Sequence, residues 1–346
     1  MVVRLVQQAV LYRRCQNGDA RCAPRSIFTE ERDARASDLN KGANMTLPTL
    51  AFLGIGLMGK PMATRLAQAG FPVRAWNRTF AKADALRASG ADLHASIEEA
   101  VSGADIIISM LASGAVVGQV LDAALPVLRE GATWIDMSST QHGEALEFHA
   151  RLAARGLRFI DAPVSGGVAG AEAGTLAIMA GGAPEDFARA EPVFAILGRA
   201  ALVGPAGCGQ VAKLCNQLIV GGTINIVAEA LLLAQAAGAD AAAVRAAIRG
   251  GFAESRILEM HGQRMLERNF IPGGQVKSQL KDLQNVLVAA ADAGVVLPLT
   301  ALVTEHYRTI EAEHPRADHS AALLALEKIN PGQRLGHGPD QLPEAD

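Results

Sequence analysis

Between residues 47 and about 206, short apolar runs alternate with longer segments of helical periodicity. The apolar runs predict strands at residues 50–53, 72–76, 106–108, 133–135 and 158–160. Helices are predicted between them, at residues 60–69, 80–88 and 144–154. Strands that alternate with helices form a parallel sheet through right-handed crossovers, so this region is predicted to be an α/β domain.

After about residue 207 the strand pattern fades and long Ala/Leu-rich periodic segments follow. They predict helices at residues 210–237, 240–249, 277–293 and 299–313, which end near Gly238, Gly294 and Pro298. We therefore expect a leader at 1–45, a dinucleotide-binding domain at 46–206, a helical domain with a long linking helix at 207–332, and a frayed tail at 333–346. The most apolar stretch, 218–237, is interrupted by polar residues, and no membrane span is expected.

Residues 1–44 mix basic, acidic and small polar residues without a sustained pattern, which favours disorder. The early arginines resemble those of a mitochondrial transit peptide, but five acidic residues argue against that interpretation. Met45 stands directly before the first patterned segment, so translation could also begin there. An N-terminal mass that begins upstream of Met45 would exclude this hypothesis.

Composition limits the classes of partner. Of 346 residues, 50% are hydrophobic and only 4% aromatic, and the net charge is -3, which argues against nucleic-acid and membrane binding. Four cysteines without zinc-like spacing and eight scattered histidines argue against a bound metal. Cysteine usage is typical of a reducing compartment, so a cytoplasmic protein is expected, and the apolar helical domain favours a homodimer or homotetramer.

A glycine-rich turn joins the first predicted strand to the first predicted helix. Its sequence is Gly54-Ile-Gly56-Leu57-Met58-Gly59. Such glycines allow a tight turn, close approach of a pyrophosphate and close packing of helix on strand, while the helix N-terminus offers free N–H groups. This position predicts a dinucleotide site of the Rossmann type, although a purely structural turn would have the same glycines.

The tip of the second predicted strand carries Asn77-Arg78-Thr79 instead of the acidic residue that usually binds the ribose of NAD. Arg78 offers a forked cationic donor to a 2′-phosphate, and Asn77 and Thr79 offer hydrogen bonds. We therefore expect NADP to be preferred, with NAD as the alternative. An ordinary surface arginine would give the same sequence.

Two further segments carry candidate chemistry. Ser165-Gly166-Gly167 directly follows a strand region, and its hydroxyl and backbone N–H groups could hold a small carboxylate; a structural glycine loop is the alternative. Lys213 lies on one face of an apolar helix with Asn216 and Gln217. Lysine is rarely buried without a partner, so Lys213 is either a general acid or a lysine whose ammonium extends to solvent.

Several motifs in the same order resemble the β-hydroxyacid dehydrogenase family over residues 47–330. They are GIGLMGKPMATRL, DAPVSGG with AGTL, GCGQVAKLCNQ, IRGGFAES, LKDLQNVL and ADHSAAL. The resemblance implies a Rossmann-like domain, a long linking helix, an all-helical domain and an active site between them. Gln217 departs from the asparagine that many members carry four residues after the lysine, a pattern associated with the tartronate semialdehyde group of the family.

The resemblance also implies residue roles. Ser165, Gly166 and Gly167 would hold the substrate carboxylate, Lys213 would be the catalytic acid or base, and Asn216 and Gln217 would orient the substrate. The remaining roles concern Lys281, which would reach the cofactor, Asp282, which would steady Lys213, and Phe252, which would line the pocket.

The expected reaction is NAD(P)H-dependent reduction of a small aldehyde that bears a carboxylate, with tartronate semialdehyde converted to D-glycerate as the leading substrate. Glyoxylate or succinic semialdehyde reduction and 3-hydroxyisobutyrate oxidation are the alternatives within the class. A non-catalytic NADP-binding module is the alternative of another class, and the presence of Lys213 counts against it.

Overall fold

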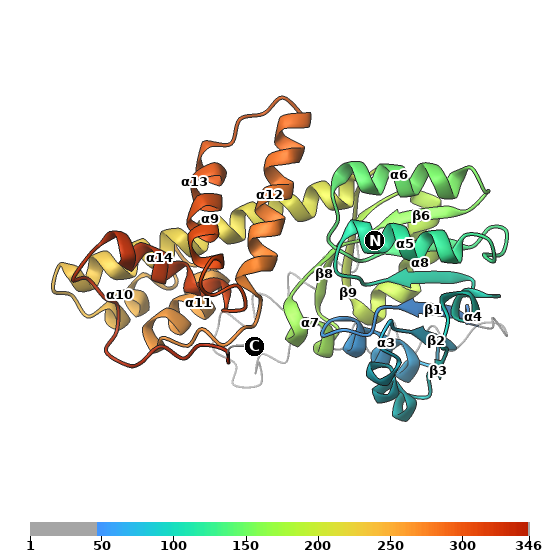
Figure 1. Ribbon diagram of the computed structural model, residues 1–346, viewed down its shortest axis with the longest axis horizontal. Coiled ribbons are helices and arrows are strands. Elements are labelled where there is room, and N and C mark those ends of the chain that lie inside the picture. The colour runs from blue at the N-terminus through green and yellow to red at the C-terminus, as the bar shows by residue number, and fades with distance from the viewer. Residues whose placement is uncertain (1–46, 345–346) are drawn as a thin grey trace, which may run out of the picture. The chain divides into compact units, whose positions relative to one another are not determined.

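The computed structural model describes residues 47–344, so the expectations for the leader and for translation from Met45 lie outside the described residues. The first half of this range is a sheet covered by helices on both faces (Figure 1). The strand order is β3-β2-β1-β4-β5-β6-β8-β7, and β9 pairs with β8. The strands are β1 Leu50–Leu53, β2 Val73–Trp76, β3 Asp92–Leu93, β4 Ile106–Ser109, β5 Thr133–Asp136, β6 Arg158–Asp161, β7 Val164–Ser165, β8 Leu176–Gly181 and β9 Gly198–Gly204.

Strands β1 to β6 are all parallel where they pair, as the alternating pattern predicts. Beyond β6 the sheet continues with β8, which is antiparallel to both β6 and β7 and parallel to β9. The hydrophobic pattern did not predict this mixed extension, because β7 is only two residues long and β8 and β9 contain glycine and alanine that weaken a strand pattern.

Each central strand is buried on both faces, which explains the continuous apolar runs. Within β1, Leu50 and Phe52 belong to one hydrophobic core, whereas Ala51 and Leu53 belong to the other. The helices of this half are α3 Gly59–Gln68, α4 Ile97–Val101, α5 Gly114–Ala124, α6 His142–Ala153, α7 Gly167–Ala173 and α8 Pro184–Leu197. Buried residues of α3 and α8 complete the first core, and those of α4, α5 and α6 complete the second.

The segment after β2 corrects one predicted helix. Residues 80–88 form two 3₁₀ turns, η1 Phe80–Lys82 and η2 Asp84–Ser89, instead of an α-helix. Only Ala83 and Leu86 of this segment are buried, and a spacing of three suits a 3₁₀ turn, in which side chains i and i+3 are aligned.

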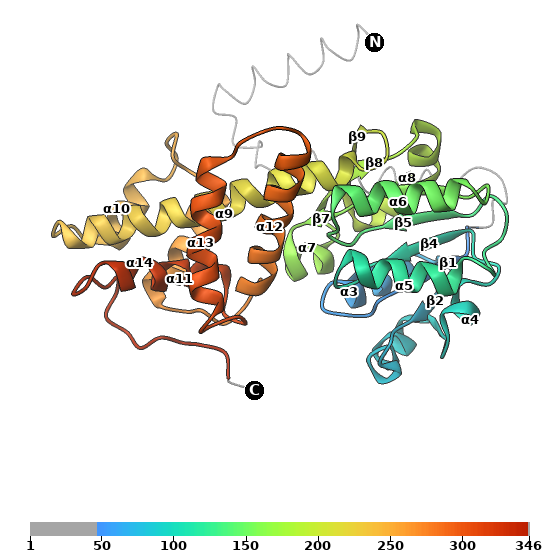
Figure 2. The same ribbon diagram turned by 45° about the horizontal axis from the view of Figure 1, so that its top comes forward.

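The second half is helical, as predicted. Its elements are α9 Cys208–Ala236, α10 Ala241–Ile248, α11 Arg256–Glu267, α12 Val276–Asp292, α13 Pro298–Glu311, η3 His319–Ala321 and α14 Ala322–Ile329. Helix α9 contacts every other α-helix of this half, and α12 and α13 lie side by side (Figure 2). By length and composition α9 could cross a membrane, but 44% of its most apolar window is buried inside the protein. Leu231 and Ile224 are fully buried, as expected for a core helix.

Residues 333–344 differ from the expected frayed tail. Leu335 is fully buried, and its carbonyl oxygen accepts a 2.7 Å hydrogen bond from Arg268. Arg268, itself only 1% exposed, also pairs with Glu327 and Asp340. A buried guanidinium needs several acceptors, and the tail supplies two of them.

Candidate functional site

The glycine-rich turn lies between β1 and α3, and its glycines serve different purposes. A Cβ on Gly54 would lie 2.3 Å from the Met110 carbonyl oxygen, and a Cβ on Gly59 would lie 1.9 Å from the Gly54 carbonyl oxygen. A Cβ on Gly56 would meet nothing within 4 Å. Gly54 and Gly59 are therefore required by the packing of the turn, whereas Gly56 faces open space that a ligand could approach.

The N-terminus of α3 suits an anion. Met58, the residue that precedes the helix, makes no side-chain cap, and the first turn contains no acidic residue. Met58 packs against the core and Leu57 is 81% exposed. The first N–H groups of the helix are thus free of an acidic neighbour, so the residues present fit the pyrophosphate of a dinucleotide.

The tip of β2 combines a structural residue with an exposed one. Asn77 Oδ1 accepts a 2.9 Å hydrogen bond from the Ile55 N–H, and Asn77 Nδ2 donates to the Thr79 carbonyl oxygen at 2.9 Å. Arg78 and Thr79 are exposed, and Arg78 has no hydrogen bond or ion pair with another residue in the described range. Asn77 therefore ties the tip to the glycine turn, while Arg78 is available to an anionic ligand.

The predicted carboxylate loop starts at β7 and leads into α7. Ser165 is half-buried and pairs with Ala177 of β8. Gly166 and Gly167 are exposed and have φ angles of 138° and 62°, which favour glycine. Strand β8, which pairs with β7, also packs against α9. Within the described residues no hydrogen bond joins Ser165 to Lys213, so their closeness in the site stays a prediction.

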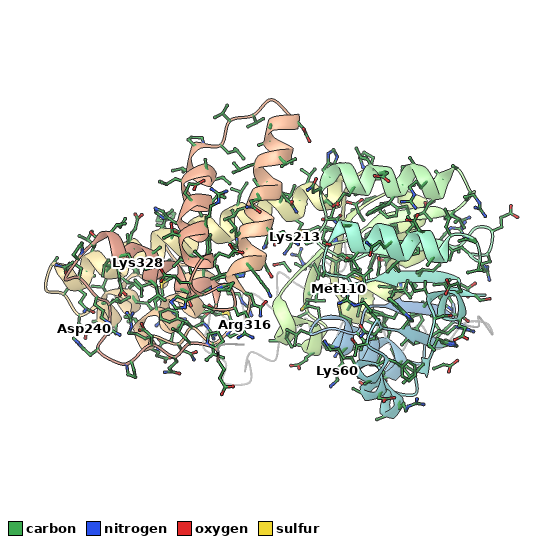
Figure 3. The ribbon with its side chains drawn as sticks, viewed as in Figure 1. Lys60, Met110, Lys213, Asp240, Arg316 and Lys328 are labelled. Atoms are coloured by element: carbon green, nitrogen blue, oxygen red, sulfur yellow. The ribbon has the colours of Figure 1, made fainter. Side chains whose placement is uncertain are left out.

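Lys213 lies near the start of α9 and is only 9% exposed (Figure 3). Its Nζ donates a 2.9 Å hydrogen bond to Gln217 Oε1, which also accepts from Asn216 Nδ2 at 2.8 Å. The structure thus brings the three predicted residues together on one helix. Lys213 does not extend its ammonium to solvent.

Helix α12 provides the other side of this cluster. Asp282 Oδ2 accepts a 2.7 Å hydrogen bond from Gln217 Nε2, and Asp282 Oδ1 accepts from Ser139 Oγ at 3.2 Å. Lys281 Nζ lies 3.2 Å from both Asp282 Oδ1 and the Ser139 carbonyl oxygen. The carboxylate therefore reaches Lys213 through Gln217, and Lys281 joins α12 to the loop that follows β5.

Burial dominates the protonation of Lys213. Removal from water lowers the pKa of the Lys213 ammonium from its ordinary value, the Asp282 carboxylate opposes this change, and Lys281 adds to it. A lysine with a lowered pKa transfers its proton more readily near neutral pH than an exposed lysine does. The arrangement can therefore supply a proton to a developing alkoxide.

A small cavity of about 130 Å³ adjoins Lys281. It is bounded by the first turns of α5 and α6, by the residues just before them and by α12, namely Ser113, Gly114, Ala115, Ser139, Thr140, Gln141, Glu144, Lys281 and Asn285. The carboxyl ends of parallel strands are the usual place for a ligand in such sheets, so the cavity is a reasonable extension of the dinucleotide site.

Phe252 is the residue that the resemblance implies for the pocket lining. It lies in the connection between α10 and α11 and is fully exposed, so its role in a pocket stays a prediction. The connection follows α10, which packs on α9 and α11, whereas Lys213 lies in the second turn of α9. A sequence motif cannot show which face of a loop the protein buries.

Three buried polar residues that the sequence analysis did not select support the cluster. Asp161 accepts hydrogen bonds from the N–H groups of Gly207 at 2.7 Å and Gln210 at 2.8 Å. The Gln210 side chain bonds the backbone of Ser138 and Thr140. Gln279 of α12 contacts Gln217. Asp161 had a usable signal, since a carboxyl group at the end of a buried strand requires partners.

Among residues 47–344, no group of three or more His, Cys, Asp or Glu side chains is placed to hold a metal ion. Cys208 and Cys215 are both free thiols.

Two family models cover most of the chain. Residues 49–215 match the NAD binding domain of 6-phosphogluconate dehydrogenase. Residues 207–326 match the NAD-binding domain of NADP-dependent 3-hydroxyisobutyrate dehydrogenase. The two matches meet in α9, where Lys213 lies, and they support a nicotinamide cofactor.

The chain matches several relatives over nearly their full length. The 2-hydroxy-3-oxopropionate reductase of Escherichia coli is 41% identical over 283 residues, 80% of this chain and 97% of the relative. The NAD-dependent L-serine dehydrogenase of Pseudomonas aeruginosa is 36% identical over 75% of this chain and 91% of its own. The solved structure of Mycobacterium tuberculosis 3-hydroxyisobutyrate dehydrogenase with L-serine has a TM-score of 0.77, 34% identity and coverage of 81% and 99%.

Proposed function

The chain belongs to the β-hydroxyacid dehydrogenase family, and we propose that it reduces tartronate semialdehyde to D-glycerate with NADPH as the preferred hydride donor. The chain is an NAD(P)-dependent oxidoreductase that acts on hydroxyl groups, as its relatives are. The observation that carries the proposal is the buried Lys213 and its bond to Gln217, because a packing role would not require a desolvated ammonium with an acceptor.

The chemistry follows from that ammonium. The reduced nicotinamide, when bound, supplies the hydride. As negative charge develops on the carbonyl oxygen, Lys213 donates a proton to it and completes the alcohol. Gln217 holds the Lys213 ammonium through Oε1, and the partly exposed Asn216, which shares that acceptor, would contact the substrate.

A carboxylate next to the reacting carbon would bind at Ser165, Gly166 and Gly167. The Ser165 hydroxyl has no hydrogen bond to another residue of the described range, and the two glycines are exposed with positive φ angles, the kind of backbone that can hold a small anion. Tartronate semialdehyde presents such a carboxylate. The 41% identity to the 2-hydroxy-3-oxopropionate reductase of Escherichia coli supports this substrate over the alternatives.

The preference for NADPH rests on Arg78. The guanidinium is exposed at the tip of β2, and no acidic residue of the Asn77-Arg78-Thr79 tip would repel a 2′-phosphate. NADH is the alternative donor, as the name of the NAD-dependent relative from Pseudomonas aeruginosa illustrates.

A kinetic panel tests the proposal. Purified protein is assayed with tartronate semialdehyde, glyoxylate, succinic semialdehyde and methylmalonate semialdehyde, each with NADPH and with NADH, and with 3-hydroxyisobutyrate and L-serine in the oxidising direction. We expect the highest kcat/KM for tartronate semialdehyde with NADPH. A higher value for any other substrate would replace the proposed substrate, and no turnover of any would contradict the proposed substrate class.

We also propose that the enzyme is cytoplasmic and that it forms a homodimer or homotetramer. The supporting feature is an apolar stripe along α9, where Ile219, Ile226 and Leu233 recur every seven residues and are 60%, 62% and 69% exposed. Light scattering coupled to gel filtration measures the mass directly, and a monomer at micromolar concentration would contradict this part.

A further inference from the structure

Gln279 is a fully buried polar side chain on α12 that makes two bonds to a single residue of α9. Its Nε2 donates to the Gln217 carbonyl oxygen at 3.0 Å, and its Oε1 accepts from Gln217 Nε2 at 3.3 Å. One carboxamide thus holds both the backbone and the side chain of Gln217. The first bond fixes the orientation of the Gln279 carboxamide, since the Gln217 carbonyl oxygen accepts only from its amino end.

The orientation of the Gln217 carboxamide matters because its two ends have opposite hydrogen-bonding character. Its oxygen faces the Lys213 ammonium, and its amino group faces Asp282 and Gln279. A flipped carboxamide would place donors against the Lys213 ammonium and an oxygen against a carboxylate. The acceptors Asp282 and Gln279 on α12 therefore decide whether the Gln217 oxygen faces the Lys213 ammonium.

We propose that Gln279 is a positioning residue for the reduction, which holds the Gln217 carboxamide with its oxygen toward Lys213, and that Gly221 provides the space that admits it. This inference rests on the proposed function of Lys213 as proton donor. Gln279 acts through Gln217, with no contact to Lys213 itself.

Gly221 stands one turn after Gln217, where α9 and α12 approach closely. A Cβ at position 221 would lie 2.7 Å from Gln279 Nε2 and 3.3 Å from a methyl group of Leu283. At the next position, Gly222, a Cβ would meet nothing within 4 Å. The two glycines are equal in helix propensity, so their difference isolates the space that Gln279 occupies.

The charged groups that act on Lys213 come from α12: Asp282 favours its ammonium form and Lys281 disfavours it. Neither changes when Gln279 is replaced. Weakening the bond from Lys213 to Gln217 Oε1 removes a contact to the charged form and lowers the pKa of Lys213 further.

The first test replaces Gln279 by leucine, which keeps most of the volume and removes both bonds. We expect kcat to fall about three- to tenfold with little change in KM, and the basic limb of the pH profile to move down by about half a unit or more. A purely structural role would lower thermal stability and leave the pH profile in place. An unchanged profile in a folded Gln279→Leu protein would overturn the proposal.

The second test compares Gly221→Ala with Gly222→Ala. The first should reproduce the Gln279→Leu profile because the new methyl group displaces the carboxamide, and the second should match the parent. This pair remains decisive if Gln279→Leu does not fold. Equal profiles for the two alanine variants would contradict the role given to Gly221 and Gln279.

The third test needs no turnover. NMR titration of lysine labelled with ¹³C at Cε, with the Lys213 signal assigned by its loss in Lys213→Met, follows the protonation of Lys213 directly. We expect a lower pKa in Gln279→Leu and Gly221→Ala than in Gly222→Ala. If these shifts appear without reductase activity, the positioning stands and the proposed function fails; if activity is present and all titrations coincide, the positioning fails alone.

Discussion

Helices α3 and α9 begin in similar ways but have different N-termini. Each follows a glycine-rich turn, and neither has a side-chain cap from the residue before it or an acidic residue in its first turn. In front of α9, however, the buried Asp161 accepts hydrogen bonds from Gly207 and Gln210. In front of α3 no carboxyl group of the described chain takes this place, and Gly56 faces open space.

The difference shows how one local motif serves two purposes. A helix N-terminus offers unpaired N–H groups, and the oxygens of a carboxyl group from the same chain accept hydrogen bonds from them as phosphate oxygens do. The start of α9 is therefore a joint that fixes where Lys213 lies, while the start of α3 stays available to a dinucleotide. Changes at the two helices should consequently affect different measurements.

The largest effect is expected near the joint, for Lys213→Met. Methionine keeps the apolar stem but removes both charge and proton, so kcat should fall at least about a hundredfold. The affinity for NADPH should change little, because the proposed phosphate site lies at α3. Stopped-flow kinetics and fluorescence titration measure the two quantities. Turnover within tenfold of the parent would mean that Lys213 is structural and that α9 contributes no chemistry.

The next largest effect is expected on the dinucleotide side, at the tip of β2, for Arg78→Ala. A charge-assisted contact to a 2′-phosphate contributes about 1.5 to 3 kcal/mol, so the Kd of NADPH should rise about ten- to a hundredfold while that of NADH changes little. Arg87→Ala, another exposed arginine that pairs with Asp84, is the matched control. Equal losses for both cofactors would show that Arg78 does not distinguish them.

The smallest effect is expected for Asp161→Asn, which reopens the start of α9. Asparagine can accept from one N–H but presents an amino group to the other, so the free energy of unfolding at pH 5 should fall by about 1 kcal/mol. Urea denaturation measures it. Asp84→Asn, at an exposed position, should change stability by less than half as much.

The pH dependence sharpens this last comparison. Burial raises the pKa of Asp161 to about 7, although the bonds from Gly207 and Gln210 lower it. Between pH 4 and 7 the native protein therefore retains a proton that the unfolded chain releases, and this residue makes the parent less stable as pH rises. The Asn variant lacks this slope, so the advantage of the parent at pH 5 should disappear and reverse by pH 8, since two pH units correspond to about 2.7 kcal/mol. Parallel curves would contradict the assigned proton.

Local signals allowed much of the fold to be predicted. The run at β1, the glycine turn and the periodicity of α9 and α12 were recognised because burial on both faces of a strand or along one side of a helix repeats within a few residues. The 3₁₀ turns η1 and η2 and the antiparallel pairing of β8 were not predicted, since two buried residues or a two-residue partner strand give no period.

Spacing along the sequence was enough to identify the candidate site residues. Gly54, Gly56 and Gly59 act through backbone geometry that neighbouring residues set, and Lys213, Asn216 and Gln217 share a helix face by their spacing alone. What they contact was decided by tertiary structure. The acceptors Gln279 and Asp282 lie 62 and 65 residues after Gln217, and packing of α12 on α9 brings them together.

The same packing determined burial. Phe252 belongs to a motif that predicts a pocket residue, yet its loop leaves it fully exposed. Asp161 begins the DAPVSGG motif, which gives no hint of its contact with α9, and its carboxyl group accepts hydrogen bonds at the start of that helix. Periodicity records which side of an element is apolar, whereas the partner of a polar side chain depends on which distant element fills the neighbouring space. That information exists only once the chain is folded.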